Sequence, residues 1–202
     1  MNKGCIVTLA ILSLIVPLVL AVRFDTIKDV ANTINQASED YIIVVGSSNP
    51  TKDVVAAANF GKFIRDGFTN YKLDTEIDLL NFPEEYLIVI GGPCANTLWK
   101  EYSTFTCENW QYKETKGILE LTEKNGKTIL LIAGTTGDDT ETITNRLVQT
   151  YDTDPLFTDS RVIIPYSEEE KSSVEQGTYL CGNGNCDMGE GPDSCPADCH
   201  ED

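Results

Sequence analysis

Cysteines are the side chains of this 202-residue chain with the most distinctive chemistry. Cys5 lies in an apolar N-terminal segment, and six others follow it: Cys94, Cys107, Cys181, Cys186, Cys195 and Cys199. An even number of cysteines in an exported chain favours disulfides. Grouping along the sequence predicts that Cys94 pairs with Cys107 and that the last four pair among themselves. A zinc site on four thiolates would need two short Cys-x2-Cys pairs, which these spacings do not provide.

Side-chain oxygens crowd the stretch that contains the last four cysteines. They belong to Asn183, Asp187, Glu190, Asp193 and Asp198. Calcium takes roughly six to eight oxygen ligands, so this density is compatible with a bound Ca²⁺ ion. The spacing is not that of an EF-hand loop. Two interpretations stay open, a calcium site and a disulfide-bonded knot with an acidic surface.

Glycine-bearing turns follow three apolar runs, at Gly46, at Gly91 with Gly92, and at Gly134. In an open α/β sheet the turns after parallel strands meet at the carboxyl edge, where ligands bind and where helix N-termini favour anions. The chain contains neither a Gly-x-Gly-x-x-Gly fingerprint nor a Gly-Lys-Ser or Gly-Lys-Thr loop. Structural turns and helix caps therefore account for these residues better than a cofactor site does.

Acid–base catalysis finds little support in the sequence. Asp138 and Asp139 fit a helix cap better than a catalytic pair, and His200, the single histidine, has no nucleophile beside it near the C-terminus. A hydrolase triad would therefore lack its base. Asp74 and Asp138 are a conceivable acid and base of a glycosidase, whose carboxyls lie roughly 5 to 10 Å apart, but nothing in the sequence brings them together.

The elements that carry these turns predict an α/β fold with a mostly parallel sheet. Apolar strands over Tyr41–Val45, Tyr86–Ile90 and Lys127–Ala133 each lead through a glycine turn into a helix. Because both faces of the central strand are apolar, we expect helices on both faces of the sheet. Gly117–Leu121 forms one β-hairpin with the third strand through the turn at Asn125-Gly126.

Further elements complete this prediction. An amphipathic helix within 23–39 has a buried face made of Ile27, Val30, Ala31 and Ile34. The helix that Ser48 or Asn49 caps has a core-facing stripe made of Val54, Val55, Ala58, Phe63 and Ile64. Residues 74–80 alternate like a half-exposed edge strand, and 159–166 form a last short strand. The helix that follows the glycine turn at Gly134 is expected to begin at Asp138, with Glu141 completing a capping box.

Composition limits the classes of partner. Fifteen Lys and Arg residues stand against thirty-two Asp and Glu, a formal net charge of −17. Binding to nucleic acid requires clustered basic residues, so the chain is not expected to bind it. A length of 202 residues with 41% hydrophobic residues suits one domain with a tail.

The N-terminus predicts export. Lys3 precedes an apolar run over 5–22, and Val19, Leu20 and Ala21 resemble a signal-peptidase site, so residues 1–21 are predicted to be a secretory signal. Two alternatives stay open. The run is nearly long enough to remain as a membrane anchor, which would be the chain's single route to a membrane, and it faintly resembles an archaeal pilin helix.

The order of the strands and turns resembles a known family. VVGSSNP, LIVIGGPCANTLW and GILELTEKNGKTILLIAGTTGDDT, within 40–165, resemble the α/β domain of archaeal S-layer proteins and related secreted archaeal proteins. The same order of strands and glycine turns is loosely similar to that of bacterial cell-wall-binding repeats. The resemblance implies a non-catalytic component of the cell surface. The chain has one short domain and no Asn-x-Ser/Thr sequon without proline, which fits an accessory protein better than the lattice subunit.

The tail carries a second resemblance. CGNGNCDMGEGPDSCPADC, over 181–199, resembles short CGNGxCxxGExPxxCPxDC modules of secreted microbial proteins. Nineteen residues are too few for a hydrophobic core, so disulfides must hold the unit together. The positions that recur in the module's pattern imply Asn183, Glu190 and Asp198 as the calcium ligands, if calcium is bound.

The sequence thus predicts four segments: a signal peptide or retained anchor over 1–21, an S-layer-like α/β domain over 22–166, an acidic linker over 167–180 and a Cys-rich module over 181–202. The expected function is that of an extracellular structural or envelope-binding protein at the cell surface, with no residue in a catalytic or cofactor-binding role. The expected partners are other surface-layer proteins, cell-wall glycan or further copies of the chain. An extracellular carbohydrate-active enzyme and a pilin-like filament subunit are the alternatives.

Overall fold

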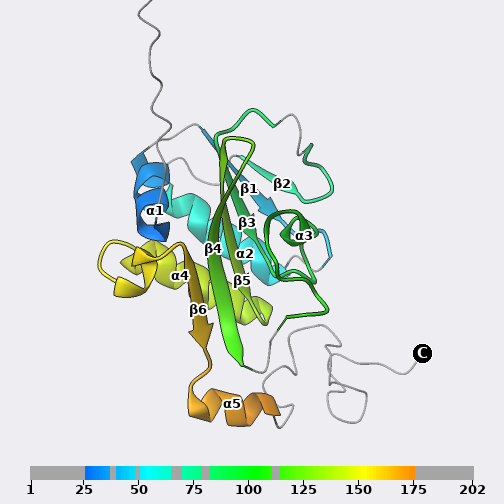
Figure 1. The fold of residues 1–202 in the computed structure, drawn as a ribbon, viewed down its shortest axis with the longest axis vertical. Helices are drawn as coiled ribbons and strands as arrows, with labels where there is room; N and C mark the ends of the chain where they lie inside the picture. Colours follow the sequence, from blue (N-terminus) through cyan, green and yellow to red (C-terminus); the bar gives the residue numbers. More distant parts are fainter. Residues whose placement is uncertain are drawn as a thin grey trace, which may run out of the picture.

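A computed structural model describes residues 26–36, 40–48, 51–64, 70–78, 82–110 and 114–175 (Figure 1). The predicted signal peptide and the predicted Cys-rich module lie outside the described residues, and so do the module's four cysteines and three predicted calcium ligands. The strands are β1 (Tyr41–Val45), β2 (Tyr71–Leu73), β3 (Tyr86–Ile90), β4 (Thr115–Lys124), β5 (Lys127–Gly134) and β6 (Arg161–Pro165). The helices are α1 (Ile27–Gln36), α2 (Thr51–Phe63), α3 (Trp99–Tyr102), α4 (Gly137–Thr150), the 3₁₀ turn η1 (Pro155–Thr158) and α5 (Glu168–Glu175).

The strands form one mixed six-stranded sheet in the order β2-β1-β3-β5-β4-β6. β2, β1, β3 and β5 run parallel to one another, whereas β4 is antiparallel to both β5 and β6. The predicted hairpin is confirmed, because β4 and β5 join through Asn125 and Gly126 at φ of 55° and 73°. Positive φ at both positions is what a tight hairpin turn requires. The predicted mostly parallel α/β sheet is therefore confirmed, with two antiparallel pairings at one side.

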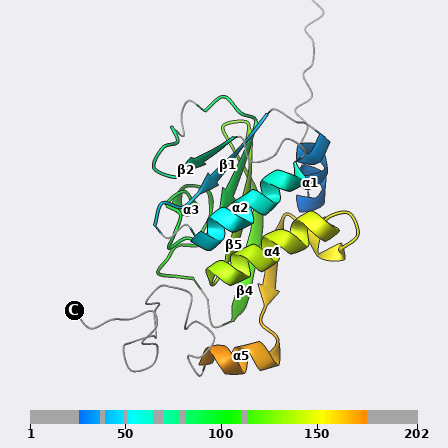
Figure 2. The same ribbon diagram turned by 180° about the vertical axis from the view of Figure 1, so that it is seen from behind.

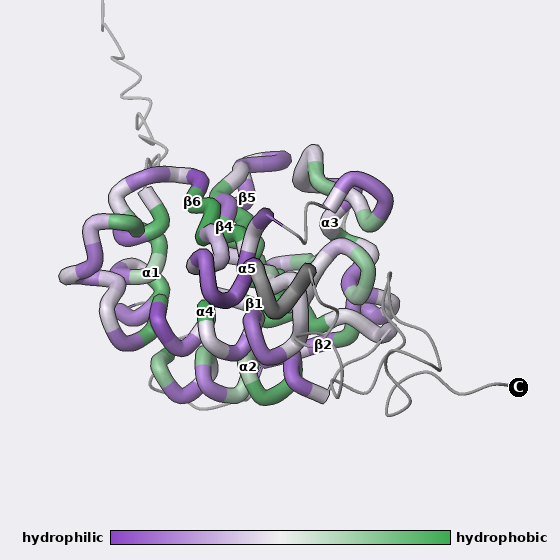
Figure 3. The backbone as a smooth tube through the Cα atoms, turned by 90° about the horizontal axis from the view of Figure 1, so that it is seen from below, coloured by the Kyte–Doolittle hydropathy of each residue, from purple (hydrophilic) through white to green (hydrophobic). Residues whose placement is uncertain are grey.

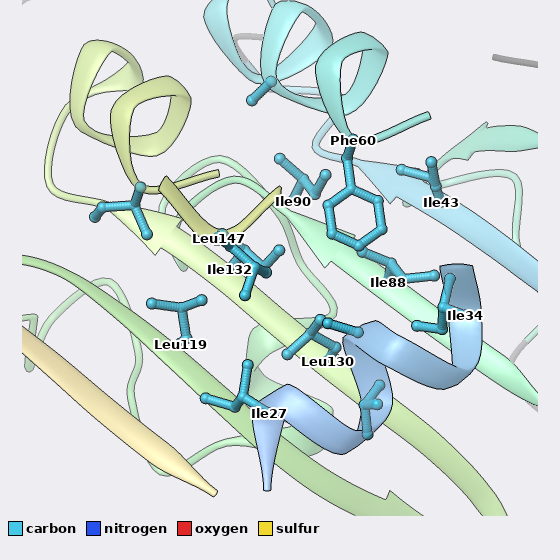
Figure 4. Packing of buried hydrophobic residues seen from close by; sticks show 14 of the residues in the cluster. Ile27, Ile34, Ile43, Phe60, Ile88, Ile90, Leu119, Leu130, Ile132 and Leu147 are labelled. Atoms are coloured by element: carbon cyan, nitrogen blue, oxygen red, sulfur yellow. The ribbon is translucent and has the colours of Figure 1, made fainter. Parts of the chain in front are cut away.

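One face of the sheet is covered by α1, α2 and α4, and α2 and α4 lie side by side across it (Figure 2). The four apolar residues predicted for α1 are all buried. Figure 4 shows Ile27 and Ile34 of α1, Phe60 of α2 and Leu147 of α4 directed at isoleucines and leucines of the strands. Each such side chain contributes roughly 1.5–3 kcal/mol when it is removed from water, so this layer supplies much of the core.

The opposite face is covered differently from the expectation. Its helix, α3, has four residues, and the rest of the cover comes from loop segments on both sides of it. Trp99, Trp110, Leu98 and Phe82 supply the buried side chains there. Seen from below, the strands lie between the layer of α2 and α4 and the segment that carries α3 (Figure 3). The Cys94–Cys107 disulfide links the turn after β3 to the segment that follows α3.

Two local predictions differ from the structure in position. The edge strand is β2, which ends at Leu73, and Asp74 begins the turn that follows it. The Asp74 carboxylate accepts hydrogen bonds from the backbone amides of Ser47 and Thr97. In the predicted core stripe of the second helix, Ile64 is buried and Val54 and Phe63 pack against the core, but Val55 is 40% exposed. The buried residues of α2 itself are Asp53, Ala56, Ala57, Phe60 and Gly61. In the segment predicted as a linker, residues 168–175 form α5.

Candidate functional site: a pocket at the carboxyl edge

The three glycine turns converge on one cavity of about 300 Å³. It is lined by residues 51–53 at the start of α2, by 92–95 after β3, by 134–137 after β5, and by Ser48, Trp110 and Thr140. We call it the carboxyl-edge pocket. Small-molecule pockets usually measure roughly 300–1,000 Å³, so this one has room for one small ligand.

The strand order explains why a cavity forms at this place. From β1 the chain crosses to β2 on one side, and it then returns to β3 on the other side of β1. The connections leave β1 and β3 in opposite directions, which separates the two turns at the carboxyl edge. Ligands of open α/β sheets bind at such switch points. The sequence placed the three glycine turns at this edge, and it favoured structural turns and helix caps over a cofactor site.

Asp53 is the most unusual side chain of the carboxyl-edge pocket. It lies in the first turn of α2 and is 4% exposed. Burial raises the pKa of its carboxyl from 3.8 to about 6, against the opposing effect of a hydrogen bond with the Thr140 side chain. Gly91 leaves room for this carboxylate, because a Cβ at that position would lie 2.4 Å from Asp53 Oδ2. Gly91 also has a φ of 106°, which glycine adopts without strain.

The sequence analysis missed Asp53, although a pattern could have found it. Asp53 precedes Ala56, Ala57 and Phe60 by three, four and seven positions, and all four residues are buried. That spacing is the buried face of an amphipathic helix. A carboxylate on the apolar stripe of a helix, at the edge where a sheet binds ligands, indicates a functional site rather than a surface residue.

Helix α4 begins with a capping box that forms another wall of the pocket. Thr136 is the N-cap, and its Oγ1 accepts a hydrogen bond from the Asp139 amide at 3.1 Å. The Thr136 amide and hydroxyl both donate to Asp139 Oδ2, as does the Tyr166 hydroxyl. The predicted cap of Asp138 and Glu141 was therefore wrong, because Thr136 supplies the hydroxyl and Asp139 stands at the third helical position.

Lys52 and Asp138 form an ion pair at the rim. Lys52 Nζ lies 2.8 Å from Asp138 Oδ1 and 3.7 Å from Glu141 Oε2, and it joins the first turns of α2 and α4. The side chains of Lys52 and Asp138 are 47% and 62% exposed. Lys52 also lines the pocket, and exposed pairs of this kind contribute little to stability.

Trp110 closes the pocket on the side of α3. Its Nε1 donates to Thr135 Oγ1 at 3.0 Å, and its ring stacks edge-on against Trp99 with centroids 5.9 Å apart. The Cys94–Cys107 disulfide, predicted from the sequence, is confirmed and ties the two ends of this segment together. The wall made by Trp110 is thus fixed by a hydrogen bond, aromatic packing and a covalent link.

The conceivable catalytic pair of Asp74 and Asp138 has no support in the structure. Asp74 is buried, and its carboxylate accepts hydrogen bonds from the backbone amides of Ser47 at 2.8 Å and Thr97 at 2.7 Å. Burial opposes the charge, but these amides outweigh it and hold the pKa of Asp74 below its ordinary value. Asp74 therefore fastens two loops together, while Asp138 pairs with Lys52.

A search for metal ligands gives no candidate within the described residues, where no group of three or more His, Cys, Asp or Glu side chains could hold an ion. The predicted calcium ligands Asn183, Glu190 and Asp198 lie outside that part of the chain. In the same described part, no helix is both long and apolar enough to cross a membrane.

Comparison with known proteins identifies the central part of the chain. Residues 69–151 match the family described as "S-layer like family, outer domain". This segment is similar to the outer domain of the S-layer-like family. It contains β2, β3, α3, the β4–β5 hairpin and α4, whereas β1 and α2, which supply Asp53, precede it. The match agrees with the resemblance found in the sequence and supports a cell-surface location. No curated protein matches the chain.

Proposed function

We propose that this chain is an exported, non-catalytic component of the cell envelope, accessory to a surface layer. The S-layer-like domain at residues 69–151 is the observation that carries this proposal. A disulfide in the same domain supports it, because disulfides persist in oxidising compartments outside the cytosol. The net charge of −17 favours a soluble surface and contacts with cations or with basic partners rather than with nucleic acid.

Localisation with assembly state tests the proposal. Antibodies against residues 26–175 would be used for immunogold labelling of intact cells and for fractionation of isolated envelopes. We expect label at the cell exterior and recovery of the chain with the envelope. A chain that ends at residue 175 serves as the matched variant, because it separates attachment through the α/β domain from attachment through the Cys-rich module. Recovery in the cytosol would overturn the proposal.

A calcium chelator adds a second readout to the same fractionation. Calcium held by Asn183, Glu190 and Asp198 would make release from the envelope depend on the chelator. The chain that ends at residue 175 lacks those ligands, so we expect its release to be independent of the chelator. Equal release of both chains would contradict a calcium-dependent role of the module.

A carbohydrate-active enzyme is the second candidate, and one observation favours it. Asp53 is a buried carboxyl whose pKa of about 6 suits a general acid. Glycosidases use two carboxyls, however, and Asp53 is the one acidic side chain among the residues that line the carboxyl-edge pocket. Incubation of the purified chain with envelope polysaccharides decides between the candidates. Hydrolysis that Asp53→Asn abolishes would replace the proposed function with an enzymatic one.

A further inference from the structure

The carboxyl-edge pocket presents hydrogen-bond acceptors and donors to the same small space. The Asp53 carboxyl supplies the acceptor from the start of α2. Residues 51–52 and Gly137 belong to the first turns of α2 and α4, whose backbone amides have no acceptor within their own helix. Hydroxyl groups of Ser48 and Thr51 add groups that both donate and accept, whereas the Thr135 hydroxyl already binds Trp110 Nε1 and the Thr115 carbonyl.

This mixture is a poor match for a simple ion. An anion at the two helix N-termini would meet the Asp53 carboxylate, and the nearby Lys52 charge is already engaged by Asp138 and Glu141. A metal cation would find a single carboxylate where hard cations require several oxygen ligands. The pocket instead suits an uncharged molecule with hydroxyl groups on adjacent atoms, because each hydroxyl can donate to Asp53 and accept from an amide.

The apolar part of the lining narrows the ligand class further. Trp110 and Pro93 line the same cavity, together with Cys94 of the disulfide. Sugar rings have one face of C–H groups that packs on aromatic and apolar side chains and an edge of hydroxyls that binds polar groups. A cavity of about 300 Å³ has room for a single ring and not for a longer stretch of polymer.

We propose that the carboxyl-edge pocket binds one neutral sugar residue, with Asp53 accepting hydrogen bonds from adjacent ring hydroxyls and Trp110 packing against the ring. The terminal sugar of an envelope glycan is the expected source. That assignment of the source depends on the proposed envelope function, whereas binding of the sugar by the purified chain does not.

The test titrates the purified full-length chain with glucose, galactose, mannose and N-acetylglucosamine, monitored by two-dimensional amide NMR. At least one sugar is expected to shift the amides of residues 51–53, 91–92 and 134–137. Asp53→Asn should weaken that binding about tenfold or more, because it removes a charged acceptor. Asp159→Asn is the matched control. Asp159 is exposed, lies just before β6 and does not line the pocket, so this substitution should leave the affinity unchanged.

Each outcome bears on the proposal. The amide spectrum of Asp53→Asn shows whether the variant is folded, so loss of binding can be separated from loss of structure. Absence of shifts with all four sugars, shifts confined to other surfaces, or equal affinity of Asp53→Asn would overturn the site. Binding of a free sugar without binding of isolated envelope glycan would overturn the glycan source alone. Envelope localisation without sugar binding would leave the proposed function intact and refute the sugar site. Sugar binding without envelope localisation would support the sugar site and refute the proposed function.

Discussion

Two buried aspartates of this chain have opposite pKa shifts, and their hydrogen bonds explain the difference. Asp74 accepts bonds from the amides of Ser47 and Thr97, which stabilise its charge. Asp53 is buried with the hydroxyl of Thr140 as its stabilising partner, so burial raises its pKa to about 6. A buried carboxylate with so little compensation costs stability at neutral pH. Asp74 thus has the character of a structural residue, whereas Asp53 is the buried carboxylate on which the proposed sugar site depends.

The substitution Asp53→Asn is expected to stabilise the chain at pH 7.5. The carboxyl has a folded-state pKa of about 6 against an ordinary 3.8, so its contribution to stability is present below the lower value and is lost as the pH rises through 6. That difference corresponds to roughly 3 kcal/mol. Urea unfolding should show a gain of about 1–3 kcal/mol for the variant at pH 7.5 and little gain at pH 4.5. A variant less stable than the parent at pH 7.5 would contradict this account.

The substitution Asp74→Asn should have the opposite effect. An amide cannot accept hydrogen bonds from both Ser47 and Thr97 in the present geometry without turning its own N–H₂ group toward one of them. We expect a loss of about 1–3 kcal/mol at pH 7.5, measured by urea unfolding. Because the folded-state pKa of Asp74 is lowered, its contribution is present above the ordinary value and disappears as the pH falls through the folded-state value. The two proteins should therefore converge in stability under acid conditions, and a constant difference down to low pH would argue against a charged Asp74.

Long apolar elements were predictable from the sequence, and polar details were not. Strands β1 and β3 have the bounds that their apolar runs predicted, and the Asn125-Gly126 turn gave the hairpin. Where an element begins or which face it buries depends on partners far away in the sequence. The buried face of α2 was predicted only in part, because Asp53 is buried against Gly91, which follows β3 and is far away in the sequence.

Helix α4 gives a direct comparison of the predicted and observed caps. Thr136→Ala removes the N-cap hydroxyl and a partner of the buried Asp139, so we expect a loss of about 1–2 kcal/mol in thermal or urea unfolding. Asp138→Ala is the matched control, since it removes the residue that the sequence favoured as the cap but leaves the capping box in place. It should cost less than about 0.5 kcal/mol, because its exposed ion pair with Lys52 contributes little. A larger loss for Asp138→Ala than for Thr136→Ala would restore the sequence-based assignment.

At the scale of the whole molecule, the S-layer-like domain is part of a larger folding unit. The family match begins just before β2 and ends after α4, so it omits β1. β1 nevertheless lies between β2 and β3 and pairs with both. The carboxyl-edge pocket likewise draws Asp53 and Lys52 from outside the match and Gly92 and Gly137 from inside it. The sequence predicted that the glycine turns meet at one edge of the sheet, but the pocket depends on turns brought together from three separate segments.

A fragment of residues 69–151 is therefore expected not to fold by itself. Without β1, strand β2 loses its partner and β3 exposes an unpaired edge. Loss of α1 and α2 also removes Ile27, Ile34 and Phe60 from one face of the sheet. A fragment of 26–175 retains all of these elements and should show a cooperative thermal transition and a dispersed amide NMR spectrum, neither of which we expect from 69–151. A cooperative transition in the shorter fragment would show that the matched segment is an independent domain and that β1 and α2 are additions to it.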